Sequence, residues 1–193
     1  ISQVMGQEMP FTTIQLLWVN IIMDGPPALA LGLEPVRDYV LKRKPINRHS
    51  GIIARSMFVN IIINAILIIT IVFTQSAFNI LGATSEEQGT VIFSLFAFSA
   101  LFNALNCREF GLNSTIPNFF KNKLALQIIV VTGIIQIIFT QVFQSFFNSV
   151  SLDFDMWIKI ILFASTILLS NEFVKLILRT MKNSRTMNFN SKN

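Results

Sequence analysis

The sequence predicts an all-α polytopic membrane protein, a bundle of five transmembrane helices in which the first helix is broken. Hydrophobic residues occupy 52% of the 193 positions, charged residues occupy only 13%, and the mean hydropathy is +0.60. A soluble domain carries about 25% charged residues. Five apolar stretches are each long enough to cross about 30 Å of hydrocarbon, and the charges between them alternate in sign.

We expect the membrane-spanning helices over five ranges: Phe11–Leu33, Ile52–Phe73, Val91–Cys107, Leu124–Phe143 and Met156–Ile177. The third range is short, and its helix can extend back to Glu87. Around these spans, residues 1–10 are expected to be an extracytoplasmic lead-in, 11–180 the five-helix transport region and 181–193 a short cytoplasmic tail. The chain begins with Ile-Ser-Gln, and we expect it to be part of a longer protein.

The charges between the spans predict the orientation. Basic residues gather after the first span, after the third span and behind the fifth: Arg37, Lys42, Arg43, Lys44, Arg48, Arg55, Arg108, Lys121, Lys123, Lys182, Arg185 and Lys192. The other two connections carry the acids Glu86, Glu87, Asp153 and Asp155. Short cytoplasmic connections are enriched in Lys and Arg, so the C-terminus is expected in the cytoplasm. This rule accounts for the net charge of +5 better than binding to nucleic acid does.

Cysteine and histidine chemistry have little support. Cys107 is the single cysteine, so it cannot form an internal disulfide, and His49 is the single histidine. A histidine in a basic connection has no partner for acid–base work, and no Cys/His spacing of a metal site exists. We therefore expect no catalytic residue in this sequence.

The first span contains the strongest functional signal, an amide and a carboxylate followed by a helix breaker. Asn20 and Asp24 stand four residues apart, which places them on one face of a helix. Asp24 is the only carboxylate well inside a predicted span. Ionisable groups at membrane depth are costly and mark ion paths, proton relays or ligand counter-ions. The other interpretation is a buried acid that fixes helix packing, and it leaves the neighbouring amide and the breaker unexplained.

The breaker adds further oxygen ligands. Gly25, Pro26 and Pro27 follow the acid, and prolines have no N–H group to bond the carbonyls of Ile22 and Met23. The residue before a proline also resists helical geometry. The sequence thus predicts an oxygen-rich pocket of Asn20, Asp24 and two backbone carbonyls, suited to a hard cation such as Ca2+.

Other polar residues in the spans are expected to hold helices together by hydrogen bonds between them. They are Asn60, Asn64, Asn103, Asn106, Gln136, Thr140 and Gln141. Glu172 and Lys175, three residues apart, are expected to form a local ion pair.

Several segments resemble the region from the sixth to the tenth transmembrane helix of P-type calcium ATPases. The first segment is highly specific: Gln15-Leu16-Leu17-Trp18-Val19-Asn20, Met23-Asp24-Gly25 and Ala28-Leu29-Ala30-Leu31-Gly32. Glu34-Pro35 and Leu41-Lys42-Arg43-Lys44-Pro45 are similar to the loop after that helix. Phe102-Asn103-Ala104-Leu105-Asn106 resembles the end of the eighth helix, and Asn171-Glu172-Phe173-Val174-Lys175 the end of the tenth. The later matches are weaker but stand in the right order over nearly the whole chain.

The resemblance implies that Asn20 and Asp24 coordinate transported Ca2+, in a pump that forms an aspartyl-phosphate from ATP on a cytoplasmic domain. ATP and Mg2+ would bind only in domains outside this sequence. The expected partners are the lipid bilayer, helices one to five and the phosphorylation domain. The loop from Glu34 to Gly51 would couple that domain to the ion site, through Glu34, Arg37, Asp38, Lys42, Arg43 and Lys44.

Two departures from the family pattern predict a single ion site. Pumps that move two calcium ions have Thr where this chain has Met23 and Glu where it has Ala100. A thioether and a methyl group do not replace oxygen ligands for Ca2+. The chain therefore resembles the plasma-membrane calcium pump type, and we expect a plasma-membrane location, with an organelle membrane as the alternative. The basic calmodulin-binding tail of animal members is not matched, so calmodulin is not expected as a partner.

Two other interpretations stay open at this point. A secondary cation transporter or channel subunit could use the same broken-helix device, although one buried carboxylate is few for a complete ion path. A structural membrane anchor is the second, and it gives Asn20, Asp24 and Pro26 no role.

Overall fold

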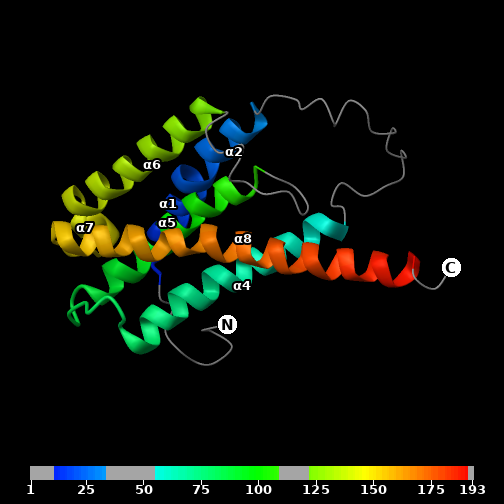
Figure 1. The fold of residues 1–193 in the computed structure, drawn as a ribbon. Helices are drawn as coiled ribbons and strands as arrows, with labels where there is room; N and C mark the ends of the chain where they lie inside the picture. Colours follow the sequence, from blue (N-terminus) through cyan, green and yellow to red (C-terminus); the bar gives the residue numbers. More distant parts are fainter. Residues whose placement is uncertain (1–10, 34–54, 109–121, 191–193) are drawn as a thin grey trace.

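The computed structural model describes residues 11–33, 55–108 and 122–190, and in these ranges the chain is helical apart from short connections (Figure 1). The helices, in chain order, are α1 (Thr13–Trp18), η1 (Val19–Asp24), α2 (Gly25–Gly32), α4 (Arg55–Phe78), α5 (Gln88–Asn106), α6 (Lys123–Val142), α7 (Gln144–Phe147) and α8 (Phe154–Asn190). The element η1 is a π-helix that joins α1 to α2. Five helical stretches are long and apolar enough to cross a membrane: Thr13–Gly32, Met57–Phe78, Gln88–Asn106, Lys123–Val142 and Phe154–Thr180. Each overlaps one predicted span, so the all-α five-helix prediction is confirmed.

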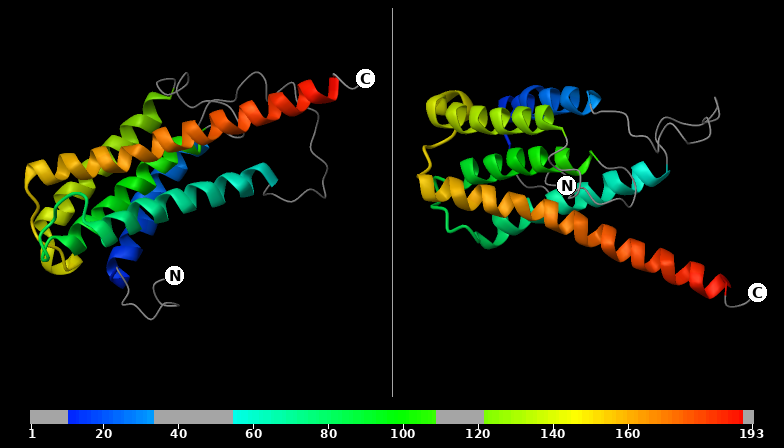
Figure 2. Two further views of the ribbon diagram at one scale, coloured as in Figure 1. Left: turned by 60° about the horizontal axis from the view of Figure 1, so that its bottom comes forward. Right: turned by 45° about the horizontal axis from the view of Figure 1, so that its top comes forward.

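Helix α5 lies at the centre of the bundle. It packs against α8, α4, α6 and the first span, with α6 and the first span on one side and α4 and α8 on the other (Figure 2). In its most apolar window, 61% of the residues are buried, whereas the figure for α4 is 11%. Helix α4 is therefore peripheral among the described helices, and they leave its outer face uncovered.

The main core forms where α8 crosses α5. Trp157, Ile160, Ala164 and Ile167 of α8 are all buried. Their spacing of three and four residues places them in one stripe of the helix. Helix α6 approaches α5 closely at Gly133, where an added Cβ would lie 3.3 Å from the Phe98 ring.

The two acidic connections lie at the same end of the bundle. The backbone N–H of Val150, just before α8, donates a hydrogen bond to Oγ1 of Thr90 at the start of α5 (2.9 Å). The turn before α5 is closed by Glu87, whose carboxylate accepts from the backbone N–H and the hydroxyl of Thr84. These two hydrogen bonds, the backbone one first, hold the pKa of the Glu87 carboxyl below its usual value.

Helix α8 continues to Asn190 and runs beyond the other helices (Figure 1). Most of the predicted tail, residues 181–193, therefore carries helical backbone. The predicted lead-in over residues 1–10 lies outside the described residues.

Candidate functional site: an amide and a carboxylate at a π-helical turn

Asn20 and Asp24 lie in the π-helical segment of the first span, on the side that the other helices leave uncovered. Both residues are exposed, and Ile21 between them is 57% exposed. The opposite side of the same segment is buried, with Val19 at 5% and Met23 at 1% exposure. The predicted pair thus shares one face, and that face points out of the bundle formed by this chain.

The predicted break in the first helix takes the form of a wider helix. Over Val19–Asp24 the backbone follows π geometry, in which a carbonyl bonds the N–H five residues on instead of four. Gly25, the residue before the first proline, stays helical at φ −58° and ψ −66°, where the sequence predicted strain. Glycine has no Cβ to clash with the following proline ring, which removes part of the penalty for that position.

In π geometry, the two predicted carbonyl ligands differ in whether a backbone N–H is in reach. The carbonyl of Ile22 has Pro26 at i+4 and Pro27 at i+5, and neither residue has an N–H group. The carbonyl of Met23 has Pro27 at i+4 but Ala28 at i+5, which does carry a donor. Covalent structure alone therefore leaves Ile22 as the better ligand of the two.

The inner side of the first span is fixed by polar contacts that flank the π segment. The indole Nε1 of Trp18 donates to Oε1 of Gln136 on α6 (2.7 Å). Its ring stacks on Phe139, with 4.7 Å between ring centroids. One turn earlier, the Gln15 side chain donates to the carbonyl of Phe147 (2.8 Å) and forms a capping box with Thr12. These contacts orient the helix, so they set the direction in which Asn20 and Asp24 point.

This arrangement offers oxygen ligands to a cation but does not surround one. One amide oxygen, one carboxylate and the Ile22 carbonyl fall short of the 6–8 oxygens that Ca2+ takes. In the part of the chain that the structure describes, no three His, Cys, Asp or Glu side chains come together. A Cβ added at Gly25, next to Asp24, would meet no atom within 4 Å. The described part of this chain therefore leaves the outer face of the π segment uncovered, with Asn20 and Asp24 exposed on it.

The remaining predicted residues fall into three groups. The coupling residues Glu34, Arg37, Asp38, Lys42, Arg43 and Lys44 lie outside the described residues. Lys175 and Glu172 form the predicted ion pair, with 3.8 Å between Nζ and Oε1. For the polar residues of α6, one predicted hydrogen bond between helices is present, from Trp18 to Gln136. Gln136 also donates to Thr140 within α6, and Gln141 exchanges two bonds with the backbone of Leu152 in the connection before α8.

Sequence reasoning gave Gln15 no role of its own. Its side chain is 4% exposed, and a polar residue so deeply buried at the start of an apolar helix needs hydrogen-bond partners. The Thr-x-x-Gln spacing of Thr12 and Gln15 is the sequence signal of a capping box and could have identified it.

Comparison with known proteins gives concordant results. The profile of the family described as "Cation transporting ATPase, C-terminus" matches residues 8–177. The chain is 33% identical over 174 residues to the probable calcium-transporting ATPase 6, plasma membrane-type, of Oryza sativa subsp. japonica, a match that covers 87% of this chain and 17% of the relative. It is also 33% identical over 165 residues to the plasma membrane calcium-transporting ATPase 1 of Gallus gallus, covering 79% of this chain and 14% of that protein. The chain thus spans about one sixth of the length of these relatives.

Proposed function

Because the chain belongs to the cation-transporting ATPases, as the C-terminal membrane region of a plasma-membrane-type calcium pump, we propose that it supplies part of a single calcium site to an ATP-driven pump. The observation that carries this proposal is the outward-facing pair of Asn20 and Asp24 at a π-helical turn. The helix that carries Asn20 and Asp24 is buried on its other face. A carboxylate and an amide on the uncovered face are therefore suited to bind a cation together with helices outside this chain. The relatives are named as calcium-transporting ATPases, so we take calcium as the cargo.

In the proposed site, the side-chain oxygens of Asn20 and Asp24 and the carbonyl of Ile22 bind the ion, and the Met23 carbonyl is a weaker candidate. The thioether of Met23 is buried at 1% exposure on the inner face, away from the oxygen ligands. A thioether does not replace an oxygen ligand for Ca2+, and Ala100 on α5 has no ligand atom. Both features support one ion per cycle.

The rest of the pump would supply what this chain lacks. With at most 17% of these relatives' length present, the remaining calcium ligands, the phosphorylated aspartate and the sites for ATP and Mg2+ are assigned to the other segments. The basic loop after the first span would lie in the cytoplasm against the phosphorylation domain and couple it to the ion site. The C-terminus would lie on the same side, and calmodulin is not assigned a site. This orientation rests on the charge rule.

The test is ATP-dependent uptake of radiolabelled calcium by the full-length parent pump in sealed vesicles. The wild type is compared with Asp24→Asn and with Asp153→Asn, a matched change at an exposed acid before α8. Losing one charged ligand costs about 1.5–3 kcal/mol, so Asp24→Asn is expected to lower calcium affinity at least about tenfold. Asp153→Asn is expected to transport normally, and the wild type to move one ion per ATP.

Normal calcium affinity in Asp24→Asn, with normal amounts of inserted protein, would refute the site. Uptake of two ions per ATP would refute the single site and keep the pump. Uptake of Mn2+ in place of Ca2+ would keep the oxygen site and change the cargo, since Mn2+ accepts the same ligand types.

A further inference from the structure

The start of the first span is attached to α7, the short helix between α6 and α8, through the side chain of Gln15. This residue is 4% exposed. Its Nε2 donates a hydrogen bond to the carbonyl of Phe147 (2.8 Å), which stands 132 positions later in the chain. Its Oε1 accepts from the backbone N–H of Thr12 (2.9 Å). Both ends of one carboxamide are thus used, one to cap α1 and the other to hold α7.

The Phe147 carbonyl depends on this donor. Helix α7 is a single turn, and it ends at Asn148, whose backbone is left-handed with φ at 49°. The last carbonyls of a helix have no N–H partner within it. The carbonyl of Gln144 accepts from the backbone N–H groups of Asn148 and Ser149, whereas that of Phe147 accepts from Gln15. Because Phe147 is 1% exposed, removing the Gln15 donor would leave a buried acceptor without a partner, which is costly.

The connection that contains α7 is itself held against the central helix α5. The backbone N–H of Val150 donates to Oγ1 of Thr90 at the start of α5. The Phe147 ring stacks on Phe93 of the same helix, with 5.7 Å between ring centroids. Gln15 therefore attaches the first span to a segment that a hydrogen bond and a ring contact fix to the core of the bundle.

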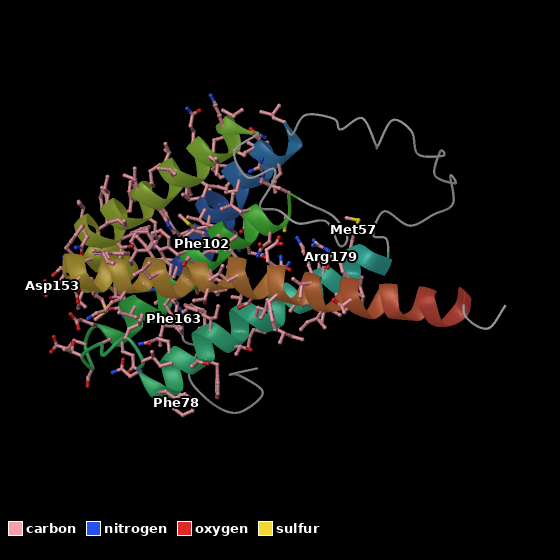
Figure 3. All side chains as sticks on the ribbon, viewed as in Figure 1. Met57, Phe78, Phe102, Asp153, Phe163 and Arg179 are labelled. Carbon is pink, nitrogen blue, oxygen red and sulfur yellow. The ribbon has the colours of Figure 1, made fainter. Side chains whose placement is uncertain are left out.

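Gln15 lies between the proposed ion site and the end of the bundle that carries the acidic connections. It precedes Asn20 by five residues. Asp153 marks this end of the bundle, and Arg179 lies toward the opposite end (Figure 3). The charge rule places the acidic connections outside the cytoplasm. Among the described residues, two hydrogen bonds thus attach the inner side of the first span, one through Trp18 beside the π segment and one through Gln15 nearer the extracytoplasmic end.

We propose that Gln15 is a positioning residue that controls on which side of the membrane the calcium site opens. A transporter exposes its ion site to one side at a time. The bond from Gln15 to Phe147 is made while the site takes calcium from the cytoplasm, and it breaks when the extracytoplasmic end of the first span moves away from α7 to let the ion out. Losing this bond therefore shifts the population toward the outward-open state. This inference rests on the proposed function.

The test measures the effect of calcium from each side of the membrane on the full-length pump. In sealed inside-out vesicles, the external calcium that half-activates ATP hydrolysis reports the cytoplasmic side, and the internal calcium that half-inhibits it reports the extracytoplasmic side. Each apparent affinity scales with the fraction of the pump in the matching state. The ratio of the inhibiting to the activating concentration therefore follows the equilibrium between the two states.

Gln15→Leu is expected to lower this ratio by about 3- to 30-fold, the range for one hydrogen bond between membrane segments. A side chain that only stabilised the fold would lower the amount of active pump and leave the ratio unchanged. The ratio thus separates a positioning role from a structural one.

Two matched variants assign the effect to the bond with Phe147. Thr12→Val removes the hydroxyl that accepts from the backbone N–H of Gln15 (3.2 Å) and leaves the bond to Phe147 in place. Losing this N-terminal cap is expected to lower thermal stability without changing the ratio. Gln127→Leu, at an exposed position of α6, is expected to change neither quantity.

A measurement on the wild-type pump does not depend on a variant that folds. Hydrogen exchange of residues 12–16 reports this end of the first span, because the Thr12 N–H is bonded by the Gln15 side chain. Exchange is expected to be slow in the calcium-bound pump. It is expected to be faster in the pump trapped with beryllium fluoride, which takes the place of the phosphoryl group on the phosphorylated aspartate.

Three results would overturn the inference. An unchanged ratio in inserted Gln15→Leu would leave the residue a structural role alone. An equal change of the ratio in Thr12→Val would assign the effect to the helix cap. Equal exchange in the two trapped forms would mean that this end of the first span does not move. ATP hydrolysis by the wild type that does not depend on calcium would instead refute the proposed function, so the two failures are distinguishable.

Discussion

The hydrogen bond between Trp18 and Gln136 should affect calcium affinity, although neither residue is a proposed ligand of the ion. Replacing Gln136 by Leu removes the acceptor 2.7 Å from the indole Nε1. The indole N–H is a donor only, and at membrane depth no water replaces the lost partner. Hydrogen bonds between membrane helices contribute about 0.6 to 2 kcal/mol, which corresponds to about a 3- to 30-fold change in an equilibrium constant.

This free energy bounds the effect on calcium binding. Trp18 directly precedes the π segment that carries Asn20 and Asp24. When the contact is lost, a smaller fraction of the pump holds these residues in the binding geometry, and the apparent affinity falls with that fraction. Gln136→Leu is therefore expected to lower calcium affinity by up to about 30-fold, together with the thermal stability of the pump.

The assay is the calcium dependence of ATP hydrolysis by the full-length pump, with thermal unfolding in detergent measured in parallel. Gln127→Leu, at an exposed position of the same helix, is the matched control. Trp18→Phe and the double variant with Gln136→Leu complete a double-mutant cycle. Because the double variant no longer contains the indole N–H that Gln136→Leu alone leaves without an acceptor, it should cost less than the sum of the single variants. Additive effects, or unchanged affinity in Gln136→Leu, would refute this coupling.

The remaining predictions concern the prolines, the buried methionine and one exposed acid. Replacing Pro26 and Pro27 together by Ala restores two N–H donors, so the π segment should return to α geometry and calcium affinity should fall about fivefold or more; unchanged affinity would show that the freed carbonyls are not ligands. Met23→Thr should leave transport at one ion per ATP, because Ala100 still supplies no ligand atom for a second ion. The variant should destabilise the pump by about 2–5 kcal/mol, as other truncations of buried Met do. A rise to two ions per ATP would contradict this. Hydrogen bonds lower the pKa of Glu87 in the folded state, so its stabilising effect is present above the unfolded pKa and is lost as the pH falls through the folded one. The stability difference between wild type and Glu87→Gln, measured by thermal unfolding over acidic pH, should therefore shrink as the pH falls, and a constant difference would argue against it.

The five spans could be predicted because hydropathy averaged over a whole helix depends little on the neighbours. Composition and the length needed to cross the bilayer identify each span, and local packing moves only its ends. The ion pair of Glu172 and Lys175 was predictable for the same reason, because a spacing of three residues within one helix places the two side chains together.

In the first helix, local sequence rules predict the break but not its geometry. The prolines remove the α-helical N–H donors of two carbonyls. A helix can respond to this loss either by unwinding or by widening to π geometry. Widening occurs here with inner-face contacts on both sides of the break, through Trp18 before it and through the buried Pro27 and Ala30 after it. A spacing of four residues likewise predicts that Asn20 and Asp24 share a face, but only the packing of the opposite face determines which way that face points.

A cavity of about 400 Å³ between α4, α5 and α8 illustrates the same limit. Asn60 and Asn64, Asn103 and Asn106, and Asn171 and Lys175 are three pairs, each about one helical turn apart and visible in the sequence. Such pairs predict hydrogen bonds between helices, and Asn106 does make one. That all three pairs face one space depends on how α4 is rotated about its axis and where it crosses α8, and no residue spacing within a single helix encodes either quantity. A peripheral helix with little buried surface has few contacts to fix that rotation.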